Sequence, residues 1–447
     1  MRNDLGFGSN DLCPKKFLFV NYCPRAWADK PIAPLNRTAA RAFRVLGGTS
    51  RDDQMEVESP FESFFMGGFE CSTHRRRDGT RLDLLAATRH DELAEADYRC
   101  LETVGLRTVR DGLRWHLVET SPHRYDWSSA LPMIRAAHST GTQVIWDLCH
   151  YGWPDDIDIW SAAFVDRFAR FAGEAARIMR EESDAVRFYC PVNEMSFWAW
   201  AGGEVARMNP ATRHRGGELK RQLARAAIAA IEAVRAVDRR ARFVYAEPGI
   251  HVTTHSKRRS DRAAAEGYRL LQFEACDLIS GKLEPELGGR ADYLDIVGVN
   301  FYPDNQWLFN GPTIPFGHHS YRPFREILSE THARYGRPVM VSETGAEGSA
   351  RASWLHYVCG EVRAALAADV PVLGLCLYPI VDYPGWENER CCDVGLFSVP
   401  DENGNRRVCE ALLEELERQQ LMIEAARAPL PSLAAPRGQL SLVASND

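Results

Sequence analysis

The chain has 447 residues, of which 45% are hydrophobic, and it carries a formal net charge of -7. This length allows one barrel domain of about 250 residues or more with extensions. Because Lys and Arg are dispersed along the sequence, no basic patch indicates a nucleic acid or an anionic membrane surface as a partner, and we expect a small neutral substrate.

The chain contains 12 cysteines. Four of them, Cys71, Cys149, Cys190 and Cys376, lie inside apolar runs, which favours buried thiols of a reduced compartment over a disulfide framework. The first 20 residues lack the pattern of a secretory signal, and no apolar stretch approaches the ~18 residues of a membrane span. The sequence therefore predicts a cytoplasmic protein.

The two ends of the chain differ from its middle. Residues 1–60 have mixed polarity, several prolines and the acidic run 52–58, which predicts an N-terminal extension or weakly ordered arm. Residues 426–447 are rich in Pro, Ala and Ser without a sustained period, which is typical of a disordered tail. Residues 61–425 remain as one domain.

Eight short runs within this domain have the composition of β-strands. They are nearly continuous in apolar residues, as at 144–146 and 296–299, which is typical of parallel strands buried on both faces. Eight such strands alternating with helices predict an α/β protein with a (β/α)8 TIM barrel. The predicted strands are 63–70, 107–112, 143–149, 187–194, 242–248, 295–302, 338–343 and 372–379.

The segments between these strands have helical spacing. In 162–181, apolar residues recur every three or four positions, so one face of this helix can pack on the barrel. Gly105, Gly141 and Gly336 follow three of the segments, where glycine ends a helix at the lowest cost. The predicted helices are 91–103, 128–140, 162–181, 218–237, 262–280, 323–335 and 353–368.

Two of the strands run directly into a glutamate. Residues 188–194 end in Glu194 and residues 338–343 end in Glu343. The carboxyl ends of barrel strands face the mouth where catalytic groups sit. Two carboxylates about 5–5.5 Å apart are what retaining hydrolysis of a glycosidic bond requires. We therefore predict Glu194 and Glu343 as a catalytic pair, the alternative for each being a carboxylate at a helix start.

The runs around these two glutamates resemble motifs of clan A glycoside hydrolases, and most of all those of the family 1 β-glycosidases, over residues 64–399. The run Cys-Pro-Val-Asn-Glu-Met is similar to the family's Thr-x-Asn-Glu-Pro motif, which implies Glu194 as acid/base and Asn193 as a ligand of the sugar 2-hydroxyl. Val-Ser-Glu-Thr-Gly resembles its Ile-Thr-Glu-Asn-Gly motif, which implies Glu343 as nucleophile.

Further segments resemble supporting parts of the same family. The resemblance implies Arg110 as partner of the nucleophile, His150 as a ligand of a sugar hydroxyl, and Trp386 as an indole beneath the sugar. The run Asn-Phe-Tyr implies a site role for Asn300 and a hydrogen bond from Tyr302 to the nucleophile. Each has a structural alternative: a buried ion pair, a loop hydrogen bond, a cap on the barrel or a core aromatic.

The sequence departs from the family at two sugar-binding positions. Residues 73–75 read Thr-His-Arg where the family carries a glutamine, and Gly385 stands where it has a glutamate that binds distal hydroxyls. The specificity pocket is therefore expected to differ, and an arginine nearby favours an anionic or otherwise decorated sugar. Candidates for the missing groups are His74, Arg75, Glu70 and Glu387.

No metal site or cofactor is expected. His251 and His255 have a spacing suited to one helix face, but no third ligand follows them in a known pattern. The sequence thus predicts a retaining β-glycosidase acting on a small carbohydrate or glycoside, with glycone, aglycone and oligomeric state open. The alternatives are a transglycosidase on the same barrel and a barrel that binds carbohydrate without turnover.

Overall fold

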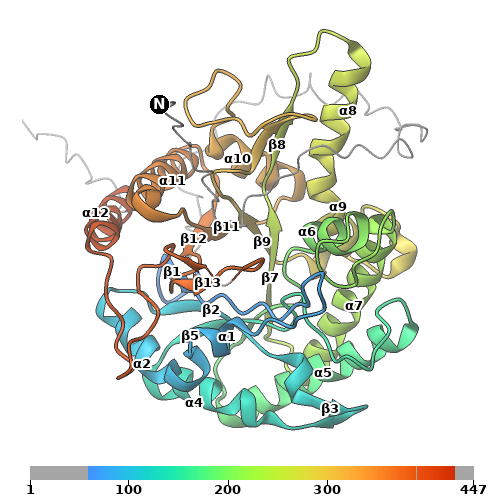
Figure 1. Cartoon of the computed structure of the whole chain (residues 1–447), viewed down its shortest axis with the longest axis vertical. Helices are drawn as coiled ribbons and strands as arrows, with labels where there is room; N and C mark the ends of the chain where they lie inside the picture. Colours follow the sequence, from blue (N-terminus) through green and yellow to red (C-terminus); the bar gives the residue numbers. More distant parts are fainter. Residues whose placement is uncertain (1–58, 389, 428–447) are drawn as a thin grey trace, which may run out of the picture.

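The computed structural model describes residues 59–388 and 390–427. The predicted N-terminal arm (1–60) lies outside the described residues except for 59–60. The predicted tail (426–447) lies outside them except for 426–427, which form the end of a helix. Within them, eight parallel strands form a closed barrel, so the predicted TIM barrel is confirmed (Figure 1). The strands follow one another around the barrel in chain order: β1 (Phe65–Gly68), β2 (Thr108–Gly112), β5 (Gln143–Asp147), β6 (Phe188–Cys190), β7 (Arg242–Pro248), β9 (Ile296–Asn300), β11 (Val339–Thr344) and β12 (Val372–Leu377).

All eight predicted strands are present, and β6 shows the largest difference in length. The prediction extended this strand to Glu194, whereas β6 ends at Cys190. Pro191 follows, and proline has no N–H to continue the hydrogen-bonded ladder. The three residues from Pro191 to Asn193 therefore belong to the turn that carries Glu194 into the mouth of the barrel.

Helices surround the barrel in Figure 1. Each predicted segment is helical, but 262–280 is divided into two helices around a tighter turn, Leu271–Phe273. At this turn the amide of Gln272 both donates to and accepts from the backbone of Ile250, which fixes the turn against the end of β7. The helices are α1 (Leu84–Ala87), α2 (His90–Thr103), α3 (Trp115–Val118), α4 (Leu131–Thr140), α5 (Ala162–Glu182), α6 (Met195–Trp198), α7 (Gly216–Val237), α8 (Arg259–Leu270), α9 (Glu274–Ile279), α10 (Phe324–Tyr335), α11 (Arg351–Leu366) and α12 (Glu410–Arg427).

The loops contain small two-stranded sheets, which the sequence did not predict. They join strands that are two or three residues long, too short for a period to show in the sequence. The pairs are β8 (His251–Thr253) with β10 (Gln306–Leu308), β13 (Tyr383–Pro384) with β14 (Cys391–Cys392), and β3 (Glu119–Ser121) with β4 (Arg124–Tyr125).

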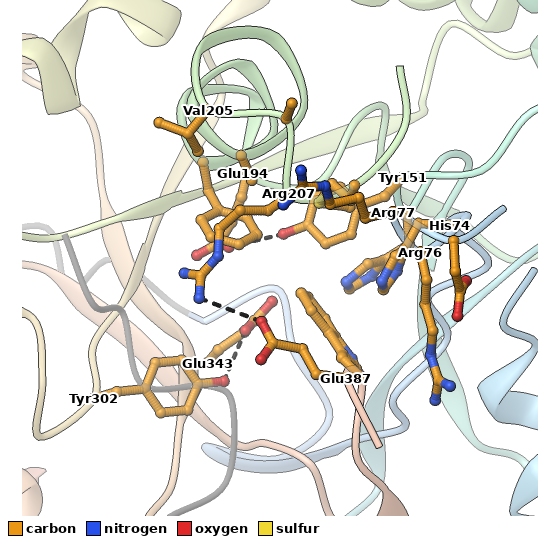
Figure 2. A pocket seen from close by; sticks show the side chains of 17 residues that line it. His74, Arg76, Arg77, Tyr151, Glu194, Val205, Arg207, Tyr302, Glu343 and Glu387 are labelled. Atoms are coloured by element: carbon orange, nitrogen blue, oxygen red, sulfur yellow. Dashed lines mark hydrogen bonds and ion pairs between the residues drawn. The ribbon is translucent and has the colours of Figure 1, made fainter. Parts of the chain in front are cut away.

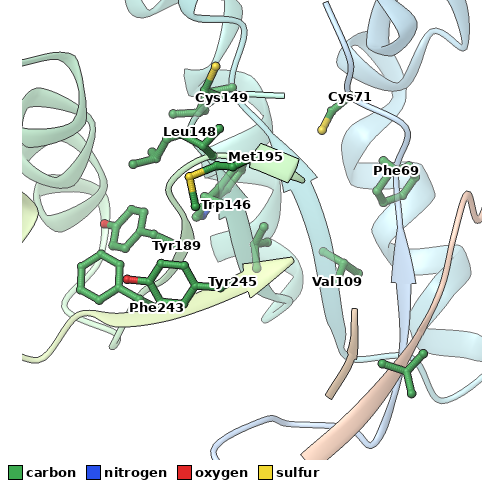
Figure 3. Packing of buried hydrophobic residues seen from close by; sticks show 14 of the residues in the cluster. Phe69, Cys71, Val109, Trp146, Leu148, Cys149, Tyr189, Met195, Phe243 and Tyr245 are labelled. Atoms are coloured by element: carbon green, nitrogen blue, oxygen red, sulfur yellow. The ribbon is translucent and has the colours of Figure 1, made fainter. Parts of the chain in front are cut away.

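Among the buried hydrophobic clusters of the described residues, two belong to the barrel itself. The outer one lies between strands and helices, and Figure 3 shows Trp146, Tyr189 and Tyr245 of the adjacent strands β5, β6 and β7 within it. The inner one takes alternate residues of the strands, such as Met66 and Ile145. Strand β2 instead places Arg110 in the interior, where its guanidinium lies 5.4 Å from the ring of Tyr378. An arginine in a barrel interior requires charged partners.

The cysteines of the described residues are all free thiols. Within the same residues no helix is long and apolar enough to cross a membrane. The cytoplasmic location stays a prediction of the sequence.

Candidate active site

A pocket of about 590 Å³ opens at the carboxyl ends of the strands, and both Glu194 and Glu343 line it (Figure 2). Both side chains are almost fully buried, each with 3% of its surface exposed. Three other predicted site residues, His150, Tyr302 and Trp386, share the lining. Residues that are far apart in the sequence therefore meet around one cavity.

Two donors hold Glu343 at the end of β11. Arg110 Nη1 lies 2.7 Å from one carboxylate oxygen, and the hydroxyl of Tyr302 donates to the other over 2.7 Å. Burial, followed by the charge of Glu343, raises the pKa of Tyr302 well above its ordinary value, so this hydroxyl keeps its proton and donates. The guanidinium and the hydroxyl thus both donate to this carboxylate, which fixes the orientation of its two oxygens at the end of β11.

Arg110 binds several side chains beneath the pocket. Its guanidinium binds both oxygens of Asp147 at 2.9 and 2.7 Å, in addition to Glu343. Burial opposes its charge, but Asp147 and Glu343 outweigh this and raise the pKa of Arg110 well above its ordinary value. In register, Arg110 pairs with Ile145, so Asp147 lies two residues further along β5 on the same inward face. The fully buried cation is thus balanced by two carboxylates.

Glu194 has a different environment from Glu343. Its carboxyl accepts hydrogen bonds from the Tyr151 hydroxyl at 2.8 Å and from the Asn300 amide at 2.9 Å. Its backbone is left-handed, with φ 41° and ψ 59°, and so is that of Tyr151, with φ 67°. Such φ values are costly for residues other than glycine and concentrate at functional sites.

The end of β9 connects the two glutamates. Asn300 donates to Glu194, while Tyr302, two residues later, donates to Glu343. The side-chain oxygen Oδ1 of Asn300 in turn accepts from the hydroxyl of Ser342, which precedes Glu343. One short segment therefore fixes the position of both carboxyl groups, and displacement of β9 would misplace both.

Asn193 and His150 form a shared network under Glu194. The Asn193 oxygen accepts from Arg110 at 2.5 Å, and its amide nitrogen lies 2.9 Å from both His150 Nε2 and the Tyr151 hydroxyl. His150 Nδ1 lies 2.9 Å from Asp147, so the ring donates there and accepts at Nε2. Of the two, His150 lines the cavity and Asn193 lies behind the lining.

Aromatic side chains form one wall of the pocket. The ring of His74 lies 4.6 Å from Trp386, and the rings of Tyr151 and Phe197 lie 5.7 and 6.1 Å from it. Burial lowers the pKa of His74 to about 3, so this imidazole is neutral and contributes an uncharged surface. Such a wall suits the apolar face of a sugar ring.

Arginines surround the opening of the pocket, but Arg75 is not among them. Its guanidinium binds Asp155 and the carbonyl of Gly79 outside the lining, so the structure does not bring this predicted residue to the cavity. Its neighbours Arg76 and Arg77 line the pocket instead, together with Arg207. The backbone explains the difference, because residues 75 and 76 form bridges with different segments, at Arg81 and Met208.

Arg76 follows the segment 73–75 directly and contacts Gly385, the other position at which the sequence departs from the family 1 motifs. Its Nη2 donates to the carbonyl of Gly385 at 3.2 Å, while its buried Nε has no hydrogen-bond partner in the part of the chain that the structure describes. Glu387, another candidate, lies on the rim and pairs with Arg207 at 3.3 Å. Glu70 lies behind the lining, 3.8 Å from His150.

Sequence reasoning missed Tyr151, Asp147 and Arg76. A signal existed for Asp147, since a charge inside the apolar strand 143–149 mirrors Arg110 in the neighbouring strand. Tyr151 gave no comparable signal because its role depends on a left-handed backbone. Arg76 sits in a run of three arginines without strand or helix period, so the sequence could not tell which one faces the cavity.

One cluster at the site has the composition of a metal site. Atoms of Cys71, Asp147 and His150 lie within 4.8 Å of one another and all three residues are buried. Both oxygens of Asp147 are, however, bonded to the Arg110 guanidinium. Burial also raises the pKa of Cys71 well above its ordinary value, which favours the thiol over the thiolate that metals bind. We assign no metal to this cluster.

Glu247, near the end of β7, supports the turn that bears Glu194. Its carboxyl accepts from the backbone N–H of Ser196 at 3.1 Å, within the first turn of α6. Burial raises the pKa of Glu247 to about 7. Between about pH 4.5 and 7 the folded protein therefore keeps a proton that the unfolded chain releases, so this group makes folding less favourable as pH rises.

We expect Glu247→Gln to remove this pH dependence. The free energy of unfolding of the variant, relative to the unmodified protein, should increase by about 3 kcal/mol between pH 4.5 and 8. Urea unfolding at a series of pH values measures the difference. A difference that stays constant over this range would show that Glu247 does not titrate in the folded protein.

Known structures share this barrel. A family 1 β-glucosidase from Thermotoga maritima matches with a TM-score of 0.65 and 15% identity, covering 81% of this chain and 97% of its own. The β-glycosidase from Thermosphaera aggregans gives 0.63 and 15%, covering 75% and 85%. The AHE enzyme from Alicyclobacillus herbarius gives 0.66 and 15%, covering 86% and 100%.

No protein-family model matches the chain, and no curated protein matches it either. At these identities the likeness to solved structures shows a common fold. The chain is therefore similar in fold to family 1 β-glucosidases, over most of their length and most of its own.

Proposed function

We propose that this protein is a retaining β-glycosidase in which Glu343 is the nucleophile and Glu194 the acid/base. The observation that carries the proposal is that the two carboxyl groups share one cavity but have different partners. Glu343 accepts from the Arg110 guanidinium, whereas Glu194 accepts from two neutral donors, the Tyr151 hydroxyl and the Asn300 amide. Different surroundings for two carboxyl groups are what assigns acid and nucleophile roles. The fold likeness to β-glucosidases points in the same direction.

In the first step, a carboxylate oxygen of Glu343 attacks the anomeric carbon and the bond from that carbon to the leaving oxygen breaks. The proton of Glu194 moves to the leaving oxygen, so the aglycone departs as a neutral alcohol. Glu343 loses its charge in the resulting ester, and Arg110 keeps its pairing with Asp147. The positive charge of Arg110 therefore keeps one carboxylate partner, Asp147, throughout the reaction.

The surroundings of Glu194 suit both of its tasks. Its two oxygens accept hydrogen bonds from the Tyr151 hydroxyl and from the Asn300 amide, which hold the carboxyl group in the cavity that it shares with Glu343. Once the proton has gone, the same two donors stabilise the carboxylate. That carboxylate then removes a proton from water, which attacks the anomeric carbon and releases the sugar with retained configuration.

We further propose that the preferred substrate bears an acidic group. Three guanidinium groups, those of Arg76, Arg77 and Arg207, line the pocket around the glutamate pair. Asp78 and Glu387 are the other acidic residues in the lining, and Glu387 pairs with Arg207. Arg76 keeps a buried Nε donor with no partner among the described residues, which an anionic oxygen would satisfy. This proposal replaces the neutral substrate expected from the overall charge.

A panel of aryl β-glycosides tests the proposal. We expect hydrolysis with retained anomeric configuration by NMR, and a higher kcat/KM for glycosides that carry a carboxylate or phosphate than for the neutral glucoside. Transfer to added alcohols in preference to water would instead indicate a transglycosidase. Absence of turnover across the panel would favour a carbohydrate-binding barrel, and inverted product would exclude the double displacement.

Arg76→Ala should then lower kcat/KM on the best anionic glycoside by about tenfold or more, the scale of a lost hydrogen bond to a charged group. The neutral glucoside should change much less. Arg75→Ala is the matched control, because this adjacent arginine lies outside the pocket and should leave the ratio between the two substrates unchanged. An equal loss on both substrates for Arg76→Ala would argue for a structural role.

A further inference from the structure

Three histidines from two loops meet on the surface of the barrel. His255 lies between β8 and α8, and His318 and His319 lie between β10 and α10. One ring nitrogen of each lies within 4.8 Å of the others, and the ring centroids are 4.1 to 5.8 Å apart. None of the three lines the pocket that holds the glutamate pair.

This arrangement differs from what the sequence suggested. The sequence pairs His255 with His251 by spacing, but the structure pairs it with two histidines more than 60 residues away. The parallel pairing of β8 with β10, in which His251 is in register with Gln306, brings the two loops together. A metal pattern of this kind cannot be seen in the sequence, because it depends on tertiary pairing.

The protonated forms of these rings would repel one another. No carboxylate forms an ion pair with any of the three within the described part of the chain. Three imidazoles at close range, without a carboxylate partner among the described residues, offer nitrogen ligands that can share one cation.

We infer that His255, His318 and His319 form a zinc site that joins the β8–α8 loop to the β10–α10 loop. Three imidazole nitrogens are ligands that Zn²⁺ prefers, and a fourth, open position would hold water. In a tetrahedral site with Zn–N bonds of about 2.0–2.1 Å the nitrogens lie ~3.3 Å apart, so the rings need only small movements.

Ser320 is the neighbouring group that such binding would affect. Its N–H donates to His318 Nδ1 at 3.1 Å, and its hydroxyl oxygen lies 3.3 Å from His255 Nε2. A metal would exchange weak contacts of this kind for coordination bonds. Because no carboxylate is among the ligands, the loaded site keeps the full charge of the ion, which favours water or a small anion in the open position.

The test uses the full chain, purified without a histidine tag, treated with a chelator and titrated with Zn²⁺ alone by calorimetry. We expect one site of micromolar or tighter Kd. The double variant His255→Ala, His319→Ala should weaken binding by about 100-fold or more, since it removes two of three ligands. Saturating Zn²⁺ should also raise the Tm of the unmodified protein by a few degrees and leave that of the variant unchanged.

Exposed histidines elsewhere provide the matched control. His138 and His356 lie on α4 and α11, outside the cluster, so the double variant His138→Ala, His356→Ala should bind Zn²⁺ like the unmodified protein. The single variant His319→Gln repeats the test with the smallest change. Absence of binding to the unmodified protein, or equal binding to both double variants, would overturn the inference. Hydrolytic activity is a separate readout, so this result is independent of the proposed function.

Discussion

Replacing Glu343 by glycine is expected to lower kcat/KM for every hydrolysed glycoside by roughly 10⁴- to 10⁶-fold, the scale of losing a covalent nucleophile. The physical reason is that neither Arg110 nor Tyr302, the two groups that hold this carboxylate, can attack the anomeric carbon in its place. Steady-state kinetics on an aryl glycoside with a good leaving group measures the loss.

The same substitution leaves a space that a small anion can fill. With azide present, Glu343→Gly should recover part of its rate by a single displacement, giving a glycosyl azide of inverted configuration. Glu343→Gln is the folding control, because it keeps the side chain's volume beside Arg110, and circular dichroism should show the native barrel for it. Full activity in either variant would disprove the role of Glu343.

The barrel could be predicted from sequence because its strands are buried on both faces. Runs such as 144–146 are apolar without alternation, and helical periods separate them, so few other folds fit. The short paired strands β8 and β10 could not be predicted in this way, because each has three residues and owes its conformation to the other. The same applies to the left-handed turn at Glu194, which no local residue preference favours.

The site could be predicted where a charged residue interrupts a buried strand. Arg110 and Glu343 each gave that signal, and the structure places them in contact. Residues on loops gave none, because a loop has no period that fixes the direction of its side chains. This is why Arg75 was predicted for the pocket while Arg76 lines it, and why His255 was paired with His251.

The effect of Glu194→Ala on kcat/KM should depend on the leaving group of the substrate. The second-order constant kcat/KM reports the reaction up to the covalent intermediate, and a good leaving group such as a dinitrophenolate needs no proton. We therefore expect nearly unchanged kcat/KM on a dinitrophenyl glycoside, but a loss of about 10²- to 10⁴-fold on a glycoside with a poor leaving group.

Azide distinguishes this variant from the nucleophile variant. In Glu194→Ala the covalent intermediate forms on Glu343 and waits for an activated water, so azide, which needs no base, should raise kcat and give a glycosyl azide of retained configuration. Tyr151→Phe, which removes one donor to Glu194 while keeping the carboxyl, is the matched variant and should lose far less on the poor leaving group. The proposal is wrong if Glu194→Ala loses activity equally on both substrates and gives a glycosyl azide of inverted configuration. Glu194 would then be the nucleophile and Glu343 the acid/base.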